Sequence, residues 1–136
     1  MRIFQAMKIS ASGLTAERFR LDLIASNVAN VNTTRTEQGG PYRRKTAVFA
    51  ERLDEASRAG GGVRVAAVSV DRSEPRLVFE PEHPDADAAG YVAYPNINIV
   101  QEMVDMITAT RAYEANVTAF NASKSMFLKA LEIGRG

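Results

Sequence analysis

The chain has 136 residues, of which 46% are hydrophobic and 24% charged, with 17 Lys and Arg, 16 Asp and Glu, one His and no Cys. This length fits one domain, and the lack of cysteine excludes disulfides, thiolate metal ligands and thiol catalysis. A net charge of +1 argues against a dedicated nucleic-acid binder, which normally has a strongly basic face. Residues 1–10 contain no uninterrupted apolar stretch and no small-residue cleavage site, so we do not expect a cleaved secretory signal.

The first predicted element is a long helix over residues 3–30. Its apolar residues recur at alternating spacings of three and four, which places them on one seam of a helix. Interrupted only by Arg18, this seam consists of Phe4, Met7, Ala11, Leu14, Leu21, Ala25 and Val28. Gly13 weakens the prediction of one continuous helix. The helix is expected to stop in polar residues that compete for backbone hydrogen bonds, namely Asn30, Asn32 and Thr33.

Residues 33–95 have a different pattern, because short runs rich in β-branched and aromatic residues alternate with turn-forming sequences. Three or four short strands are predicted, over residues 42–49, 63–70, 76–79 and 91–94. We expect Gly60, Gly61 and Gly62 to form a flexible tip or linker. Pro81 and Pro84 should keep the acidic stretch around them out of any regular element.

A second long helix is predicted to begin after Pro95, with Asn96 or Asn98 as its N-cap and Gln101 as capping-box partner, and to end at Gly134. Two rows of residues repeat every seven positions along it. One row is Ile99, Met106, Tyr113, Phe120 and Phe127, and its companion is Met103, Thr110, Val117, Lys124 and Leu131. A helix of about 36 residues would be roughly 54 Å long, so we expect an elongated molecule.

The predicted fold class is mainly α with a small β insert. Two long terminal helices pair antiparallel as a coiled coil, in a helical domain made of residues 1–32 and 96–136, and they flank a β-rich insert of residues 33–95. Helix pairing is expected to use Met7, Leu14, Leu21, Val28, Met106, Tyr113, Val117, Phe120 and Phe127. Because two helices cannot bury apolar residues on several sides, we also expect contacts with other subunits. The amides that could form directed hydrogen bonds there are those of Asn27, Asn30, Asn116 and Asn121.

The only histidine, His83, could serve as the base of a hydrolase. Its candidate nucleophiles are Ser57, Ser69 and Ser73. No nucleophile elbow is present and prolines break the segment around His83, so a histidine packed in a turn explains the sequence better. We therefore assign no catalytic residue and expect no small-molecule substrate.

An acidic stretch next to His83 resembles part of a calcium-binding loop. Asp85, Asp87 and Gly90 match the first, third and sixth positions of an EF-hand loop, but Ala89 and Asn96 occupy two ligand positions. Aspartates that cap turns explain this stretch better. We expect no metal site and no cofactor.

Residues 42–45, with the sequence YRRK, form a compact basic cluster that could contact phosphate. The cluster has only three charges. A strand edge that arginine and lysine protect against mispairing is the interpretation we favour.

Residues 24–34, with the sequence IASNVANVNTT, resemble the Asn-apolar-Ala-Asn-x-Asn-Thr signature of flagellar rod and hook proteins. The motif positions are taken by Asn27, Ala29, Asn30, Asn32 and Thr33. The sequences ASGLTA at 11–16 and RLD at 20–22 also resemble the opening of that family. The sequences GGPYRRK at 39–45, HPDAD at 83–87 and RAYEANV at 111–117 narrow the resemblance to the proximal rod proteins of the bacterial flagellum.

The resemblance implies a structural subunit of the proximal rod, the drive shaft of the flagellum, and not an enzyme. Such a subunit would self-assemble with other copies and other rod proteins into a helical tube. It would be exported by the flagellar type III apparatus without a cleaved signal peptide and would lie in the basal body on the periplasmic side of the cell envelope. In this family the two terminal helices pair as the inner domain, with the insert outside. The alternatives are a cytoplasmic coiled-coil adaptor and, less favoured, the hydrolase centred on His83.

Overall fold

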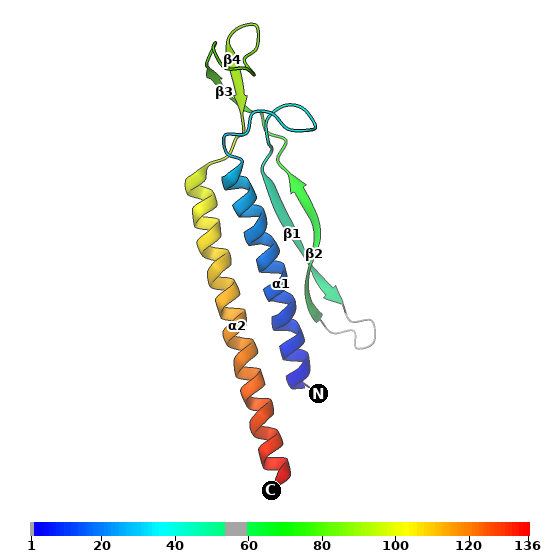
Figure 1. Cartoon of the computed structure of the whole chain (residues 1–136). Coiled ribbons are helices and arrows are strands. Elements are labelled where there is room, and N and C mark those ends of the chain that lie inside the picture. The colour runs from blue at the N-terminus through cyan, green and yellow to red at the C-terminus, as the bar shows by residue number, and fades with distance from the viewer. Residues whose placement is uncertain (1, 54–59) are drawn as a thin grey trace.

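The structure is a computed structural model and describes residues 2–53 and 60–136. Its elements in chain order are α1 (Arg2–Ala29), β1 (Lys45–Leu53), β2 (Gly60–Val70), β3 (Arg76–Phe79), β4 (Tyr91–Tyr94) and α2 (Ile99–Arg135). The two long helices lie side by side and antiparallel, as Figure 1 shows. The β1–β2 hairpin runs along the other flank of α1, and the β3–β4 hairpin extends beyond the helices at one end (Figure 1). The predicted class, mainly α with a small β region between terminal helices, is confirmed.

The first and last residues of α1 and α2 lie within two residues of the predicted helix ends. Asn98 is the N-cap of α2, and its side chain accepts a hydrogen bond from the Gln101 backbone N–H at 3.2 Å. The Gln101 side chain does not complete a capping box, because it donates to Asp105 Oδ1 at 3.2 Å instead. Gly13 does not interrupt α1, which is continuous from Arg2 to Ala29.

The side chains expected to pair the helices are half-buried, all nine of them. Phe127 contacts Phe4 on α1, with ring centroids 4.8 Å apart. The second seven-residue row on α2 is mostly exposed. Only Val117 is half-buried, and the exposed members are Met103, Thr110, Lys124 and Leu131. Val117 is also the one member of this row that the sequence assigns to helix pairing.

The closest approach of the helices involves small and polar residues instead. On α2 the buried side chains are Glu102, Ala109 and Ser123, which belong to one seven-residue row that also includes Asn116. A Cβ atom added to Gly13 on α1 would lie 2.9 Å from the Asn116 amide. Small side chains let the two helix backbones approach each other, and the larger apolar residues flank this contact.

The β1–β2 hairpin is antiparallel, with register from Lys45 opposite Val70 to Leu53 opposite Gly60. The expectation of a flexible glycine tip is wrong for Gly60, Gly61 and Gly62, because all three belong to β2. Gly62 has φ +113°, and a Cβ atom there would lie 2.1 Å from Ser12 Oγ on α1. Glycine is needed at this position because the hairpin passes so close to the helix. The rest of the tip, residues 54–59, lies outside the described residues.

The second hairpin is short and is braced by turns. Arg76 to Phe79 pair with Tyr94 to Tyr91, and the segment between them, which contains Pro81 and Pro84, forms turns as predicted. Asp87 Oδ1 caps one turn by accepting from the Ala89 and Tyr91 N–H groups at 2.9 Å. Among the described residues, no helix is long and apolar enough to cross a membrane.

Candidate functional site

A buried polar junction joins the end of α1, the start of β1 and the first turns of α2. At its centre is Asn27, whose side chain is fully buried. The amide nitrogen of Asn27 donates to the Lys45 carbonyl at 2.8 Å and to Glu102 Oε2 at 3.2 Å. Its carbonyl oxygen accepts from the Tyr42 hydroxyl at 3.0 Å and from the Lys45 N–H at 2.9 Å. An asparagine amide has two donors and two acceptor positions, so every one is used within the chain.

Glu102 is the second buried polar residue of the junction, with a relative exposure of 1%. Its carboxylate forms an ion pair with the Nε of Arg44. The same guanidinium reaches Asp105 through its Nη2, at 3.2 Å from Oδ2. A buried carboxylate is stable only when it is paired and hydrogen-bonded, and Asn27 and Arg44 together meet that requirement.

The turn that follows α1 is held by two further residues of the motif, Asn30 and Thr33. Asn30 Nδ2 donates to the Ser26 carbonyl at 2.8 Å, and the Thr33 hydroxyl donates to Asn30 Oδ1 at 3.1 Å. The Thr33 carbonyl then accepts from the Tyr42 N–H at 3.0 Å. These bonds direct the chain from the helix end back to the junction. Ala29 and Asn32 are exposed.

The strand-edge interpretation of residues 42–45 is wrong. Tyr42 is buried and precedes β1, and its hydroxyl lies 3.1 Å from Ser26 Oγ as well as bonding Asn27. Arg44 is engaged by Glu102 and Asp105, as described above. Of the three basic side chains, Arg44 pairs with carboxylates that lie far away in the sequence, and the Lys45 ammonium lies 5.6 Å from the centre of the Tyr42 ring.

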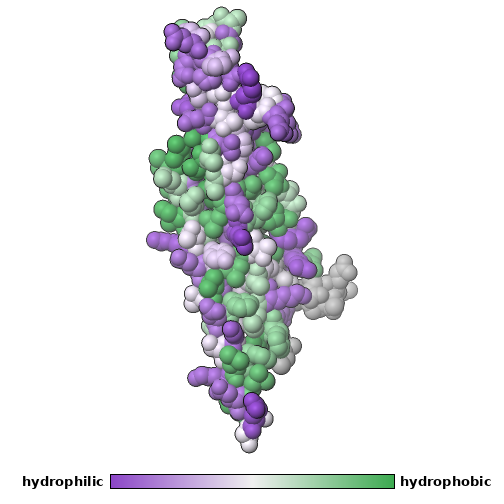
Figure 2. All heavy atoms as spheres, viewed as in Figure 1, coloured by the Kyte–Doolittle hydropathy of each residue, from purple (hydrophilic) through white to green (hydrophobic). Residues whose placement is uncertain are grey.

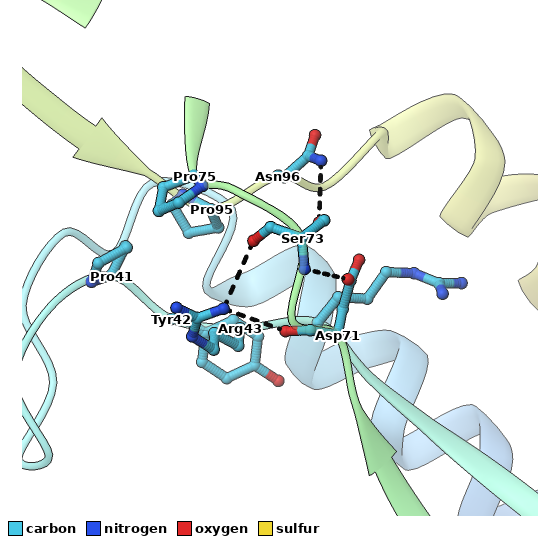
Figure 3. Close-up of a pocket in the computed structure, with 9 residues that line it drawn as sticks. Pro41, Tyr42, Arg43, Asp71, Ser73, Pro75, Pro95 and Asn96 are labelled. Atoms are coloured by element: carbon cyan, nitrogen blue, oxygen red, sulfur yellow. Dashed lines mark hydrogen bonds between the residues drawn. The ribbon is translucent and has the colours of Figure 1, made fainter. Parts of the chain in front are cut away.

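Arg43 leaves the junction in a different direction and ties two connecting segments together. Its Nη1 donates to the carbonyls of Asp71 and Ser73 at 3.4 Å, as Figure 3 shows. Asn96, just before α2, donates to Ser73 Oγ at 3.1 Å. The Ser73 backbone N–H donates to the Asp71 carboxylate, and this bond lowers the pKa of Asp71. The cavity beside these groups has a volume of about 10 Å³, which is room for one water molecule and not for a substrate.

His83 and Asp85, which the sequence raised as candidates for catalysis and metal binding, form hydrogen bonds and an ion pair that stabilise the loop between β3 and β4. His83 Nδ1 accepts from the Asp85 N–H at 3.0 Å, and neither Ser69 nor Ser73 hydrogen-bonds to it. Ser57 lies outside the described residues. Asp85 accepts from the Thr34 hydroxyl at 2.8 Å and pairs with Arg35. In the parts of the chain that the structure describes, no three His, Asp or Glu side chains are grouped as metal ligands would be.

Large apolar side chains are exposed along the first turns of α2. We call this surface the α2 stripe; it consists of Ile99, Val100, Met103, Val104 and Ile107. At 100° per residue the stripe points away from the side of α2 that is buried against α1. Figure 2 shows apolar atoms gathered over this upper part of α2. Such a surface is typical of a contact with another protein.

Of the predicted subunit-contact residues, Asn27 has no hydrogen-bonding capacity left, and Asn116 lies against Gly13 within the chain. Asn121 is exposed, and its role stays a prediction. The sequence reasoning missed Glu102 and its partner Arg44. One sequence pattern could have indicated that Glu102 is buried. It begins a row of residues seven positions apart, and the other members are small or polar: Ala109, Asn116 and Ser123.

An elongated helix pair with a hairpin along one flank and an exposed apolar stripe on α2 has the features of a structural assembly subunit. Two family models match the chain, described as "Flagella basal body rod protein" over residues 7–35 and "Flagellar basal body rod FlgEFG protein C-terminal" over residues 88–133. The first covers most of α1 and the Asn27 motif, and the second covers β4 and nearly all of α2.

Curated relatives match along the whole chain. A flagellar basal-body rod protein FlgC from Borreliella burgdorferi is 47% identical, with both chains covered completely. FlgC proteins from Bacillus subtilis and Salmonella typhimurium are 44% and 43% identical over 99% of this chain and all of theirs. The chain belongs to the FlgC family of flagellar basal-body rod proteins. This family consists of structural proteins and is not known for enzymes.

Proposed function

We propose that the chain is a structural subunit of the flagellar rod, packs with other rod proteins into a helical tube, and transmits torque along it. The observation that carries this proposal is the α2 stripe. Val100 is 69% exposed and Ile107 57% exposed, although the same helix buries its opposite side against α1. Covering such a stripe is worth about 25 cal/mol per Å² of apolar surface, which favours assembly.

A tube follows from contacts between unlike surfaces. α2, which carries the α2 stripe, lies on one flank of α1 and the β1–β2 hairpin lies on the other (Figure 1), so neighbours that use these flanks meet through two different patches. Contacts of this kind generate rings or open helices instead of closed dimers. In this proposal the terminal helical domain, residues 1–32 and 96–136, faces the inside of the tube, and the β-rich insert, residues 33–95, lies outside.

The polar junction would let the subunit transmit torque without losing its shape. Asn27, Arg44 and Glu102 connect α1, the segment before β1 and α2 through bonds that are buried or half-buried. Bonds of this kind have directional geometry, so sliding one helix along the other would break several of them together. Apolar packing alone would resist such sliding less, because it has no directional preference.

The location and route belong to the same proposal. The relatives are named basal-body rod proteins, which supports a place in the rod on the periplasmic side of the cell envelope. Export by the flagellar type III apparatus, without a cleaved signal, would bring the chain there. The expected partners are other rod proteins and other copies of the chain, with Asn121 as one contact residue.

Mass spectrometry of purified hook–basal-body complexes tests this function. We expect the chain in the complexes, at a few copies each, and not in detached filaments. A chain found only in the cytoplasm of cells with complete basal bodies would refute the proposal and favour the adaptor. The substitution His83→Ala distinguishes the rod subunit from the hydrolase. A rod subunit with this substitution should still assemble and support swimming, whereas a hydrolase would lose its activity.

A further inference from the structure

The β3–β4 hairpin has an apolar face that is largely exposed. Leu77 and Phe79 are on the same face of β3, and Tyr91 of β4 is paired with Phe79. Their exposures are 63%, 61% and 43%. The rings of Phe79 and Tyr91 stack edge to face, with centroids 5.3 Å apart. We call these three residues the tip face.

The opposite side of the same hairpin is covered. Val92 is completely buried, the Tyr94 ring lies 6.3 Å from that of His83, and the Tyr94 hydroxyl donates to Glu80 at 2.9 Å. Asp85 anchors the connecting loop to residues 34 and 35. These contacts fix the position of the tip face at one end of the molecule, so a partner could bind it without rearrangement.

The other end of the molecule has a second exposed apolar segment. Phe127 is paired with Phe4 near the start of α1, and α2 continues to Arg135, which is about 12 Å further at 1.5 Å per residue. Figure 1 shows this helix end protruding past the N-terminus. The exposed apolar residues near it are Met126, Leu128, Leu131 and Ile133.

The two ends differ in charge. Between residues 74 and 94 the acidic side chains are Glu74, Glu80, Glu82, Asp85 and Asp87, against Arg76, and Arg35 pairs with Asp85, so acidic side chains still exceed basic ones. Between residues 124 and 135 the basic side chains are Lys124, Lys129 and Arg135, against Glu132 alone. Apolar patches of opposite surrounding charge attract each other and orient the contact.

We propose that the tip face receives residues 124–135 of a second copy of this chain, the protruding end of its α2, which has apolar side chains and excess positive charge. This inference rests on the proposed rod function and adds a contact along the long axis to those between flanks. Because the two patches differ and lie at opposite ends, the contact does not close on itself, as a growing rod requires.

Disulfide trapping tests the contact, with a second copy of the chain as the probe. The chain has no cysteine of its own, so a disulfide between two single-cysteine variants can form only through the introduced residues. One full-length variant carries Leu77→Cys, and the other carries Gly134→Cys, where an added Cβ meets no atom within 4 Å. We expect a mixed disulfide to form at least tenfold faster than with Thr110→Cys, an exposed position in the middle of α2.

Two further variants test its chemistry. Adding Phe79→Asp to the Leu77→Cys chain should reduce trapping to the Thr110→Cys rate, and adding Lys124→Glu and Lys129→Glu to the Gly134→Cys chain should slow it severalfold. Because Phe79 and both lysines are exposed, circular dichroism should show unchanged folding. Equal trapping at Gly134→Cys and Thr110→Cys would overturn the proposal, as would full trapping with Phe79→Asp.

The outcome is separable from that of the proposed function. If the wild-type chain is present in basal bodies but Leu77→Cys and Gly134→Cys are not trapped, the rod function stands and the tip contact is refuted. If the cysteines are trapped but the chain is absent from basal bodies, the rod function is refuted, and with it this use of the tip face.

Discussion

At the scale of single residues, the contacts of Asn27 explain why an amide is needed at the centre of the polar junction. It joins three segments, and its partner Glu102 is 75 positions away in the sequence. A carboxylate at position 27 would face Glu102 with a second negative charge, and an aliphatic side chain would leave several polar groups buried without partners. Only a side chain with two donors and two acceptors satisfies the junction.

We predict that Asn27→Ala lowers the free energy of unfolding by about 3 kcal/mol, because the Tyr42 hydroxyl, the Lys45 backbone and Glu102 lose partners in a buried site. Urea denaturation followed by circular dichroism measures the loss. Asn32→Ala is the matched control, since Asn32 belongs to the same motif and is exposed. Its effect should stay within about 0.5 kcal/mol. Equal losses in the two variants would contradict the role assigned to Asn27.

Asp85 allows a prediction about pH. The hydrogen bond from Thr34, and then the contact with Arg35, hold the pKa of Asp85 below its usual value. A carboxyl group with a lower pKa in the folded state stabilises the fold above its unfolded pKa, and this contribution is lost as the pH falls through the folded pKa. The anchor of the β3–β4 loop should therefore weaken in acid, below the usual carboxyl range.

Thr34→Val removes the hydroxyl at nearly constant shape, so the pKa of Asp85 should rise toward its usual value. The titration of the Asp85 carboxyl carbon, followed by NMR, measures this shift. Thr36→Val serves as the control, because the Thr36 hydroxyl bonds the carbonyls of Gly39 and Gly40 instead. An unchanged Asp85 titration in Thr34→Val would show that the hydrogen bond is not the main cause.

At the scale of elements, the helix pair is organised by its smallest side chains. Ala16 on α1 and Ala109 on α2 are among the few buried apolar residues, and Gly13 lies against Asn116. Larger side chains at these positions would push the helices apart and separate the groups of the polar junction. The half-buried aromatic residues flank this contact, and they add apolar area without setting the distance between the helices.

A double-mutant cycle tests the contact between Gly13 and Asn116. Alanine favours a helix interior over glycine by about 1 kcal/mol, but the new Cβ would lie 2.9 Å from the Asn116 amide. We predict that Gly13→Ala destabilises the wild-type chain by about 1 kcal/mol and stabilises an Asn116→Ala background. Gly134→Ala, which meets open space, is the control. Additive effects in the cycle would mean that the two residues do not interact.

At the scale of the whole molecule, two kinds of surface coexist. The polar junction holds the subunit in one shape, while the α2 stripe and the tip face leave apolar area that this fold does not cover. A subunit that must join others benefits from this division, because its shape is already set when the neighbours arrive. Binding then loses less conformational entropy.

We predict that Val104→Asp abolishes incorporation into basal bodies and swimming, because a charge in the α2 stripe would be buried without a partner in the assembled rod. The isolated chain should keep its stability within about 0.5 kcal/mol, since Val104 is 50% exposed. Ala119→Asp is the control and should assemble, because Ala119 is an exposed α2 residue about four turns further along and outside the stripe. Basal bodies purified from both strains and compared by mass spectrometry give the readout. Normal incorporation of Val104→Asp would exclude the stripe as a contact.

The local features of this protein can be predicted from its amino-acid sequence. Apolar spacing located both helices, the asparagines at 96 and 98 placed the start of α2 to within two residues, and the motif around Asn27 indicated the family. These signals lie within a few residues of one another, and for that reason a linear pattern contains them. The same reasoning placed β3 and β4, and located the turn with its prolines between them.

Contacts between distant segments explain which side of α2 is buried, why Glu102 is in the interior, and why Gly62 belongs to a strand. The side chains that answer these questions are far apart in sequence: Arg44 and Asn27 for the carboxylate, and Ser12 on α1 for the glycine. Hydrophobicity finds where an apolar face lies, but small and polar residues become interior only when distant partners satisfy them and make close approach favourable.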